Sequence, residues 1–382
     1  MGFLRSHQTV SDICCLCRSQ ELTFLYTPLG TKRGISIYLC EKCGLIQSLP
    51  RLTKGDGLPS VSSGADYGWL RIGKIGRASP NLAFFRSNLP GWRPRRVLDV
   101  GASRGAFIKE FRLWLPESTI MAIEPDTSIW PDRSSVEYWK PDRIEDITFF
   151  GEAFDLVYMS HTLEHLDTPL ATLKKLREAL AKNGWLLVEV PNIRGSMGIL
   201  DIIEELYLDK HVLHFSKNTL CKMLEVAGFK PTYFQVDAEN ITILAKRGPV
   251  IPIPDDYEAA SIRPIVQAYA SDLVKNREAL KGKVWRLNRV IRNEGRPALI
   301  SGGGRILSAL VEAGLDVSLF DGVVDPWLPL DEVFSLPVLN GPKMIGYVKP
   351  RTVLVCSRTS AERMEAEVRE WEPEAKVIRW NG

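Results

Sequence analysis

A glycine-containing turn between an apolar strand and a helix constrains the fold of this chain most strongly. A strand is predicted at residues 96–100 and a helix at 106–115. The pattern Asp-x-Gly-x-x-x-Gly begins at Asp99, near the end of that strand, and continues through the turn with Gly101 and Gly105. Glycines at such a turn let the backbone come close to a ligand. The pattern therefore predicts a ligand site at the carboxyl end of a buried strand.

The strands and helices that follow alternate along the chain. Glu124 ends the next predicted strand, about twenty residues after the loop, where an acid can accept hydrogen bonds from both ribose hydroxyls of a nucleotide. Such alternation predicts a parallel sheet covered by helices on both faces. The predicted strands are 120–124, 135–139, 154–160 and 185–190, the helices are 168–182 and 216–227, and a hairpin joins 232–236 to 241–246.

Two observations favour S-adenosylmethionine over a dinucleotide as the cofactor. The glycine-loop motif itself carries Asp99, whose charge would repel a pyrophosphate but suits the amino group of a methionine moiety. The antiparallel hairpin at the end of the sheet also distinguishes this unit from a plain dinucleotide-binding fold.

Four of the seven cysteines form two Cys-x-x-Cys pairs, Cys14 with Cys17 and Cys40 with Cys43. Two such pairs can place four thiolates tetrahedrally around Zn²⁺. A redox dithiol would instead occupy a helix start beside a strand–helix–strand unit, which neither pair does. The sequence predicts a zinc-binding module whose metal supplies much of its folding energy.

The length of 382 residues predicts more than one domain. We expect an α/β protein with a zinc-binding module at 1–50, a connecting or lid segment at 51–94, a cofactor-binding core at 95–248, and a helical linker with a smaller α/β domain at 249–382. Tyr67 in the connecting segment could contact a substrate, although packing is the ordinary role of an aromatic side chain.

The C-terminal domain is predicted to begin with a long helix or helix pair at 255–293. Strands are expected at 297–301, 317–320 and 352–356, with a glycine turn at 302–304. Leu307 stands where a dinucleotide site would have its third glycine, so a structural turn is favoured there.

Charge and hydropathy limit the partners. The chain has 49 basic and 46 acidic residues, and this balance does not favour nucleic acid or an anionic membrane as the main partner. No apolar run reaches the ~18 residues of a membrane span, and no secretory signal is evident. We expect a cytoplasmic protein; its oligomeric state does not follow from the sequence.

These motifs together resemble those of the class I S-adenosylmethionine-dependent methyltransferases. The matching runs are 97–105, 122–126, 154–157, 160–169 and 188–192. The resemblance implies that Glu124 holds the ribose hydroxyls and that an acid among 142–146 meets the adenine. It also implies a cofactor pocket made of Asp99, Gly101, Ser103, Gly105, Glu124, Pro125 and Ser160, with Ser103 in the place of a glycine.

The three-part layout is similar to that of the zinc-containing sugar C-methyltransferases, which act on nucleotide-activated keto-deoxysugars. Runs 297–304 and 323–326 resemble the C-terminal domain of that family. Its histidine base follows a Tyr-x-Glu run; here His211 is kept, Lys210 occupies the glutamate position, and Tyr207 is one position early.

Histidine is the side chain best suited to remove a proton near neutral pH. His211 is our candidate general base, and His165 is the second candidate because it aligns with a family histidine near the transferred methyl group. Tyr207 is the third catalytic candidate. His161, His214 and Tyr67 are candidate acceptor-binding residues, although His165 and His214 could equally cap or pack helices.

The leading interpretation is a methyltransferase that acts on a small molecule, most simply a nucleotide sugar or a related glycan precursor. A zinc-containing RNA methyltransferase is a second interpretation, and it would need a basic stripe with interleaved aromatic residues. A third is a non-catalytic scaffold that keeps the fold and binds a partner.

Overall fold

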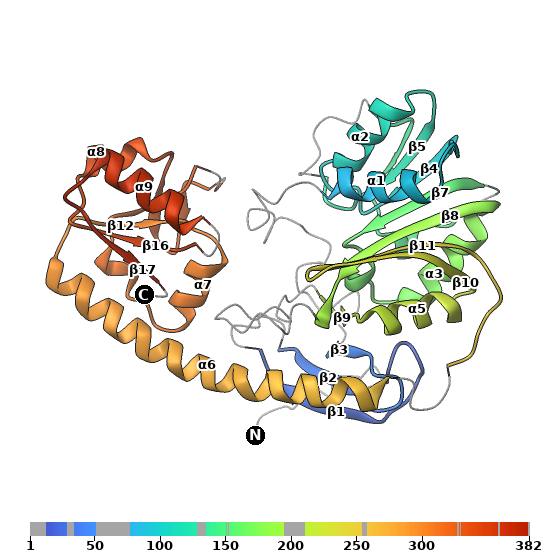
Figure 1. The fold of residues 1–382 in the computed structure, drawn as a ribbon, viewed down its shortest axis with the longest axis horizontal. Helices are drawn as coiled ribbons and strands as arrows, with labels where there is room; N and C mark the ends of the chain where they lie inside the picture. The colour runs from blue at the N-terminus through green and yellow to red at the C-terminus, as the bar shows by residue number, and fades with distance from the viewer. Residues whose placement is uncertain are drawn as a thin grey trace, which may run out of the picture. The chain divides into compact units, whose positions relative to one another are not determined.

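The structure is a computed structural model, and it describes residues 13–28, 34–50, 77–127, 135–149, 151, 153–194, 211–253, 258–326, 328, 330–357 and 360–380. Among these, the residues up to Ala270 form one compact unit and those from Ser271 onwards form a second (Figure 1). Within the described ranges, no helix has the length and apolar character needed to cross a membrane.

The first unit is built on a seven-stranded sheet of order β10-β11-β8-β7-β4-β5-β6. All neighbouring pairs from β8 to β6 are parallel, whereas β11 runs antiparallel to both β8 and β10. The predicted parallel sheet with a terminal antiparallel hairpin is thus confirmed. The strands are β4 (Arg96–Val100), β5 (Thr119–Ile123), β6 (Tyr138–Lys140), β7 (Phe154–Ser160), β8 (Leu180–Pro191), β10 (Phe229–Val236) and β11 (Asn240–Arg247).

Helices cover both faces of this sheet. Successive side chains of a strand point to opposite faces, and accordingly Val97 and Leu98 of β4 belong to two different hydrophobic clusters. Both residues are fully buried, which explains why the strand reads as a continuous apolar run. The helices are α1 (Ala78–Asn88), α2 (Ala106–Trp114), α3 (Pro169–Ala179) and α5 (Lys217–Val226), with short 3₁₀ turns η3 (Ile144–Asp146) and η4 (Leu163–His165).

Three local predictions for this unit were wrong. The helix expected at 168–182 ends at Ala179, because Leu180 takes an extended conformation and pairs with Phe154 of β7. The strand expected at 135–139 forms at 138–140 instead. Residues 78–88, for which no helix was predicted within the connecting or lid segment, form α1, and Phe85 of that helix is fully buried in the core.

A smaller antiparallel sheet adjoins the turns that contain the two cysteine pairs. Its order is β1-β2-β3-β9, formed by β1 (Leu22–Tyr26), β2 (Ser36–Cys40), β3 (Ile46–Leu49) and β9 (Leu213–His214). The antiparallel strands β1 and β2 form a hairpin between the two cysteine pairs. The fourth strand was not predicted, and it comes from the chain just after His211. We call the described residues between 13 and 50 the cysteine module.

The second unit has its own sheet, of order β14-β15-β13-β12-β16-β17. The long helix predicted before it is one helix, α6 (Ala259–Glu294), which begins in the first unit and continues into the second. The strand expected at 317–320 is instead a 3₁₀ turn, η5 (Val317–Leu319), because the Asp316 side chain accepts the Ser318 N–H and turns the chain. The other elements are β12 (Ala298–Ser301), α7 (Arg305–Glu312), β13 (Gly322–Val324), β14 (Glu332–Val333), β15 (Leu336–Leu339), α8 (Lys343–Val348), β16 (Thr352–Val355), α9 (Ala361–Trp371) and β17 (Lys376–Arg379).

Candidate functional site

The glycine loop lies at the carboxyl end of β4 and leads into α2. Gly101 and Gly105 have φ values of +74° and +71°, and Ser103 shares this left-handed region at +49°. Glycine enters this region at little cost, whereas a serine there is strained. A Cβ on Gly101 would come within 2.2 Å of Oγ1 of Thr162, so that glycine is also required by packing.

Two carboxylates flank the loop. Asp99 is 1% exposed, and neither of its oxygens has a hydrogen-bond partner among the described residues. Burial, reinforced by the charge of Glu124, raises the pKa of Asp99 well above its ordinary value. Glu124 at the end of β5 accepts the N–H of Ser103 at 2.8 Å and that of Asp126 at 2.9 Å.

These groups fit the charge of S-adenosylmethionine. A buried carboxylate without a donor is costly, and an ammonium or sulfonium group would compensate it. Glu124 adds a second negative charge at the end of the neighbouring strand, where a ribose lies in open α/β sheets. Asp99 and Glu124 could therefore hold the cofactor.

The other predicted cofactor residues lie at the same edge of the sheet. Pro125 is half-buried next to Glu124. The hydroxyl of Ser160, at the end of β7, donates to Oε2 of Glu189 at 2.6 Å. Among the acids considered for adenine, Glu145 faces Arg143 at 3.0 Å and accepts the N–H of Asp167 at 2.9 Å.

Three of the five histidines lie around a carboxylate that the sequence analysis did not single out. Glu164 in η4 is fully buried, and its Oε1 lies 3.3 Å from Nδ1 of His161, 3.7 Å from Nε2 of His165 and 4.0 Å from Nε2 of His211. Burial favours the neutral acid, but the charges of His165 and His161 outweigh it and lower the pKa of Glu164 to about 2. An ionised carboxylate thus faces three imidazole rings.

His165 and His211 are close neighbours in this group, which we call the Glu164 cluster (Glu164, His161, His165 and His211). Their ring centroids are 4.7 Å apart. One ligand atom each of Glu164, His165 and His211 lie within 4.8 Å of one another, so these three side chains could also hold a cation. An imidazole beside a buried anion is equally suited to take up a proton.

The remaining predicted residues divide into two groups. His214 is buried, and its Nε2 lies 3.1 Å from Oγ of Ser48. This contact gives His214 a structural role, as the packing alternative predicted. Burial lowers the pKa of His214 to about 4, although the charge of Glu164 opposes this. Tyr67 and Tyr207 lie outside the described residues.

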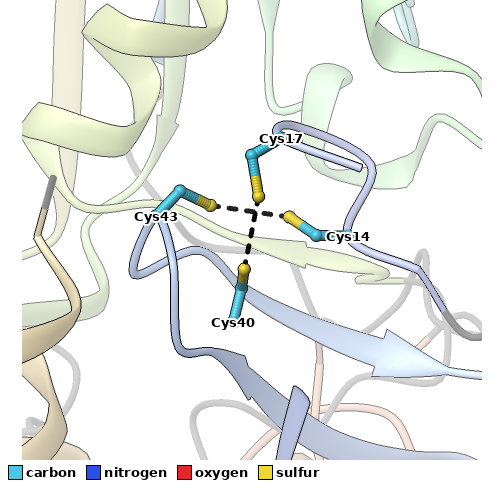
Figure 2. Close-up of side chains that lie close together, drawn as sticks. All are labelled: Cys14, Cys17, Cys40 and Cys43. Carbon is cyan, nitrogen blue, oxygen red and sulfur yellow. Dashed lines mark hydrogen bonds between the residues drawn. The ribbon is translucent and has the colours of Figure 1, made fainter. Parts of the chain in front are cut away.

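The four predicted zinc ligands converge in the cysteine module (Figure 2). The sulfurs of Cys14 and Cys43 are 3.5 Å apart, those of Cys17 and Cys40 are 3.4 Å apart, and all four lie within 4.8 Å of one another. Four thiolates around one Zn²⁺ at about 2.3 Å are separated by distances of this order. The residues present therefore fit a structural zinc ion.

Sequence reasoning missed Glu164, Glu189 and Ser48. Glu189 is buried at the end of β8, where it accepts hydrogen bonds from Asn81 at 2.7 Å and Ser160. Glu164 stands between two histidines in one short run, and a glutamate there was a usable signal. No local pattern distinguishes Ser48, because its partners are distant in the sequence.

Comparison with known proteins finds a family match in the middle of the chain. Residues 74–233 match the family model described as a methyltransferase domain. The chain is 23% identical over 184 residues to the methyltransferase str2 of Strobilurus tenacellus, covering 44% of this chain and 63% of that protein. It is 27% identical over 175 residues to the tRNA U34 carboxymethyltransferase of Pseudomonas putida, covering 43% and 52%.

Among solved structures, one similar chain is the 1,6-didemethyltoxoflavin-N1-methyltransferase of Burkholderia thailandensis, crystallised with 1,6-didemethyltoxoflavin and S-adenosylhomocysteine. It is 17% identical, covers 58% of this chain and 99% of its own, and has a TM-score of 0.41. The chain spans less than two thirds of the length of the curated relatives named above. Residues 74–233, which contain the glycine loop and lie in the unit built on the seven-stranded sheet, are therefore similar to a methyltransferase domain.

Proposed function

We propose that the chain transfers a methyl group from S-adenosylmethionine to a small-molecule acceptor, and that the acceptor is a nucleotide-activated sugar or a related glycan precursor. The observation that supports this cofactor is the buried Asp99 side chain. It has no hydrogen-bond partner among the described residues and lies near the end of β4, directly before the glycine loop. The similarity of the three-part layout to sugar C-methyltransferases supports the acceptor class.

Each acidic residue has a proposed role in binding the cofactor. The Asp99 side chain accepts hydrogen bonds from the amino group of the methionine moiety, and the Glu124 side chain accepts hydrogen bonds from the ribose hydroxyls. The cofactor supplies a methyl group already activated on a sulfonium, so the protein mainly has to align the acceptor with it. A weak carbon or oxygen nucleophile still needs a base to remove its proton.

We assign that base to His211. Its Nε2 lies 4.0 Å from Oε1 of Glu164, so the imidazole that takes up the acceptor proton stands beside a buried anion. The negative charge of Glu164 then stabilises the imidazolium that forms, because a buried anion at 4.0 Å acts in a medium that screens poorly. Four thiolates, from Cys14, Cys17, Cys40 and Cys43, hold a structural Zn²⁺ in this proposal.

An RNA acceptor is the second candidate, because curated relatives are named tRNA U34 carboxymethyltransferases. The net charge of +3 on 382 residues argues against it. Binding of RNA that weakens steeply with salt, together with no effect of sugar nucleotides, would favour this alternative.

Calorimetric titration with S-adenosylhomocysteine, with and without a panel of thymidine-diphosphate sugars, tests the proposal. We expect micromolar binding that one sugar nucleotide tightens. Binding without any sugar effect would remove the acceptor class and keep the cofactor. A complete lack of binding would favour the non-catalytic scaffold.

A further inference from the structure

The strand that follows His211 belongs to the sheet of the cysteine module and not to the seven-stranded sheet. In β9, Leu213 pairs with Gln47 and His214 pairs with Ile46 of β3. Figure 1 shows β9 beside β3. The backbone that bears the proposed base is therefore held by a module whose cysteines lie some two hundred residues earlier in the sequence.

Ser48 of β3 makes three contacts with this segment. Its N–H donates to the carbonyl of Val212 at 3.0 Å, and its hydroxyl donates to the carbonyl of His211 at 3.0 Å. A serine hydroxyl has one hydrogen, so it must accept at its third contact, from Nε2 of His214 at 3.1 Å. Ser48 is fully buried, so water does not compete for these bonds.

The same segment is fixed on its other side by η4. The N–H of Val212 donates to the carbonyl of Glu164 at 2.9 Å. The backbone next to His211 is thus held between Ser48 and Glu164, and the His211 ring is placed with its Nε2 4.0 Å from the Glu164 carboxylate. One peptide segment joins the module to the Glu164 cluster.

Gln47, the neighbour of Ser48 on β3, connects the segment after His211 to the turn of the first cysteine pair. Its side-chain oxygen accepts the N–H of Cys15 at 3.3 Å, and its amide donates to the carbonyl of Ile13 at 3.3 Å. Leu16 and Leu45 of the module also share a hydrophobic cluster with Leu163 and Val212. A change in the cysteine pairs would therefore reach His211 through two adjacent residues of β3.

We propose that the cysteine module positions the catalytic histidine, and that Ser48 is the positioning residue through which it acts. Ser48 touches no cofactor residue named above; it fixes the backbone of 211–212 and the ring of His214. Loss of its hydroxyl leaves the carbonyl of His211 and the ring of His214 without their hydrogen bond to Ser48, and the His211 ring loses its fixed place beside Glu164. The catalytic consequence rests on the proposed function, whereas the positioning itself does not.

Ser48→Ala and Ser36→Ala are matched substitutions that test this. Ser36 lies on β2 of the same sheet, and its exposed hydroxyl bonds to Thr27 at 2.8 Å. The full-length chain, labelled with ¹³C at the histidine rings, gives one Cε1–Hε1 signal for each of five histidines, and single histidine substitutions assign them. Zinc content and affinity for S-adenosylhomocysteine are measured on the same samples.

We expect Ser48→Ala to shift the signals of His211 and His214, while zinc content and S-adenosylhomocysteine affinity stay within twofold of the parent chain. Ser36→Ala is expected to shift neither signal. Once an acceptor is identified, Ser48→Ala should lower kcat tenfold or more without changing KM for the cofactor. Removal of the metal by a chelator should also shift His211.

An unchanged His211 signal in Ser48→Ala would overturn the proposal, as would equal shifts in Ser36→Ala. If Ser48→Ala does not fold, Ser48→Cys replaces the hydroxyl by a weaker donor of similar shape, and the same two signals decide. Failure of the proposed function is distinguishable, because it would abolish S-adenosylhomocysteine binding in the parent chain and leave the histidine signals as a test of positioning.

Discussion

The carboxylate of Glu124 accepts the backbone N–H of Ser103, a residue 21 positions earlier in the chain, at 2.8 Å. The acid that ends β5 is therefore tied to the loop that follows β4. Its other oxygen accepts the N–H of Asp126, so both oxygens are oriented by backbone groups. A side chain fixed in this way is held in one orientation before a ribose binds, so little conformational entropy is lost on binding.

Replacing Glu124 with alanine should weaken S-adenosylhomocysteine binding tenfold or more, or by about 1.4 kcal/mol. The substitution removes the proposed ribose acceptor and frees the loop N–H of Ser103. Calorimetry measures the affinity, and Glu225→Ala is the control, because Glu225 pairs with Lys222 on α5. Equal affinity in the Glu124→Ala and Glu225→Ala chains would remove Glu124 from the cofactor site.

Asp99→Asn should change the stability of the ligand-free protein and its affinity for S-adenosylhomocysteine in opposite directions. The wild-type carboxyl group is buried without a hydrogen-bond partner among the described residues, and burial raises its pKa well above the ordinary value, so Asp99 lowers the stability of the ligand-free protein as the pH rises from acid towards neutral. We expect the neutral amide to raise Tm and to lower S-adenosylhomocysteine affinity tenfold or more. Differential scanning calorimetry and titration measure the two effects. A lower Tm with full affinity would contradict this account.

Gly101→Ala and Gly91→Ala compare backbone strain with steric collision. Both glycines have positive φ, +74° and +79°, but a Cβ at Gly91 meets nothing within 4 Å, whereas one at Gly101 would collide with Thr162. We expect Gly91→Ala to cost about 1 kcal/mol of strain, and Gly101→Ala to cost more and to weaken cofactor binding as well. Urea unfolding and calorimetry check this, and equal effects of the two substitutions would refute the packing argument.

The sequence predicted those features that depend on neighbours along the chain. The order of strands and helices around Asp99 followed from hydrophobic pattern and glycine placement, and the two cysteine pairs marked their own module. Helix α1 was missed because Pro80 and a run of aromatic residues obscure its helical periodicity. The turn at Val317–Leu319 was mistaken for a strand because its residues are apolar, although the Asp316 side chain forms the turn.

The histidine environment could not be predicted in the same way. The pairing of β3 with β9 joins two residues to a distant strand, and such a short segment has no periodicity to read. Glu164 is charged yet fully buried, a placement that only its three imidazole neighbours explain. Nothing in the sequence around Ser48 predicts its contacts, because its partners at 211, 212 and 214 are distant in the chain.

Cys40→Ser should abolish zinc binding, and Cys15→Ser should preserve it. Both cysteines are buried in the module, but only Cys40 has its sulfur among the four that converge. Elemental analysis of the purified chains should find one zinc per parent chain and per Cys15→Ser chain, and none in Cys40→Ser. A second ion that survives Cys40→Ser and disappears in His165→Ala would place a metal in the Glu164 cluster and replace the assignment of His211 as base.

His214→Gln should flatten the dependence of stability on pH between 6.5 and 4. Burial lowers the pKa of His214 from 6.5 to about 4. The unfolded chain therefore takes up a proton below pH 6.5 that the folded chain does not, and the free energy of unfolding falls as the pH drops to 4. The difference of pKa corresponds to on the order of 3 kcal/mol. Glutamine can still donate to Ser48 and does not titrate.

Urea unfolding of the parent chain and of His214→Gln at pH 7, 6, 5 and 4 measures this effect. The stability difference between the two proteins should shift in favour of the variant as the pH falls, by roughly the amount given by the pKa change. Glu164, whose pKa is lowered to about 2, loses its contribution as the pH falls below 4.5. That loss is common to both chains and cancels in the difference. Parallel pH curves would show that His214 is not held neutral in the folded protein.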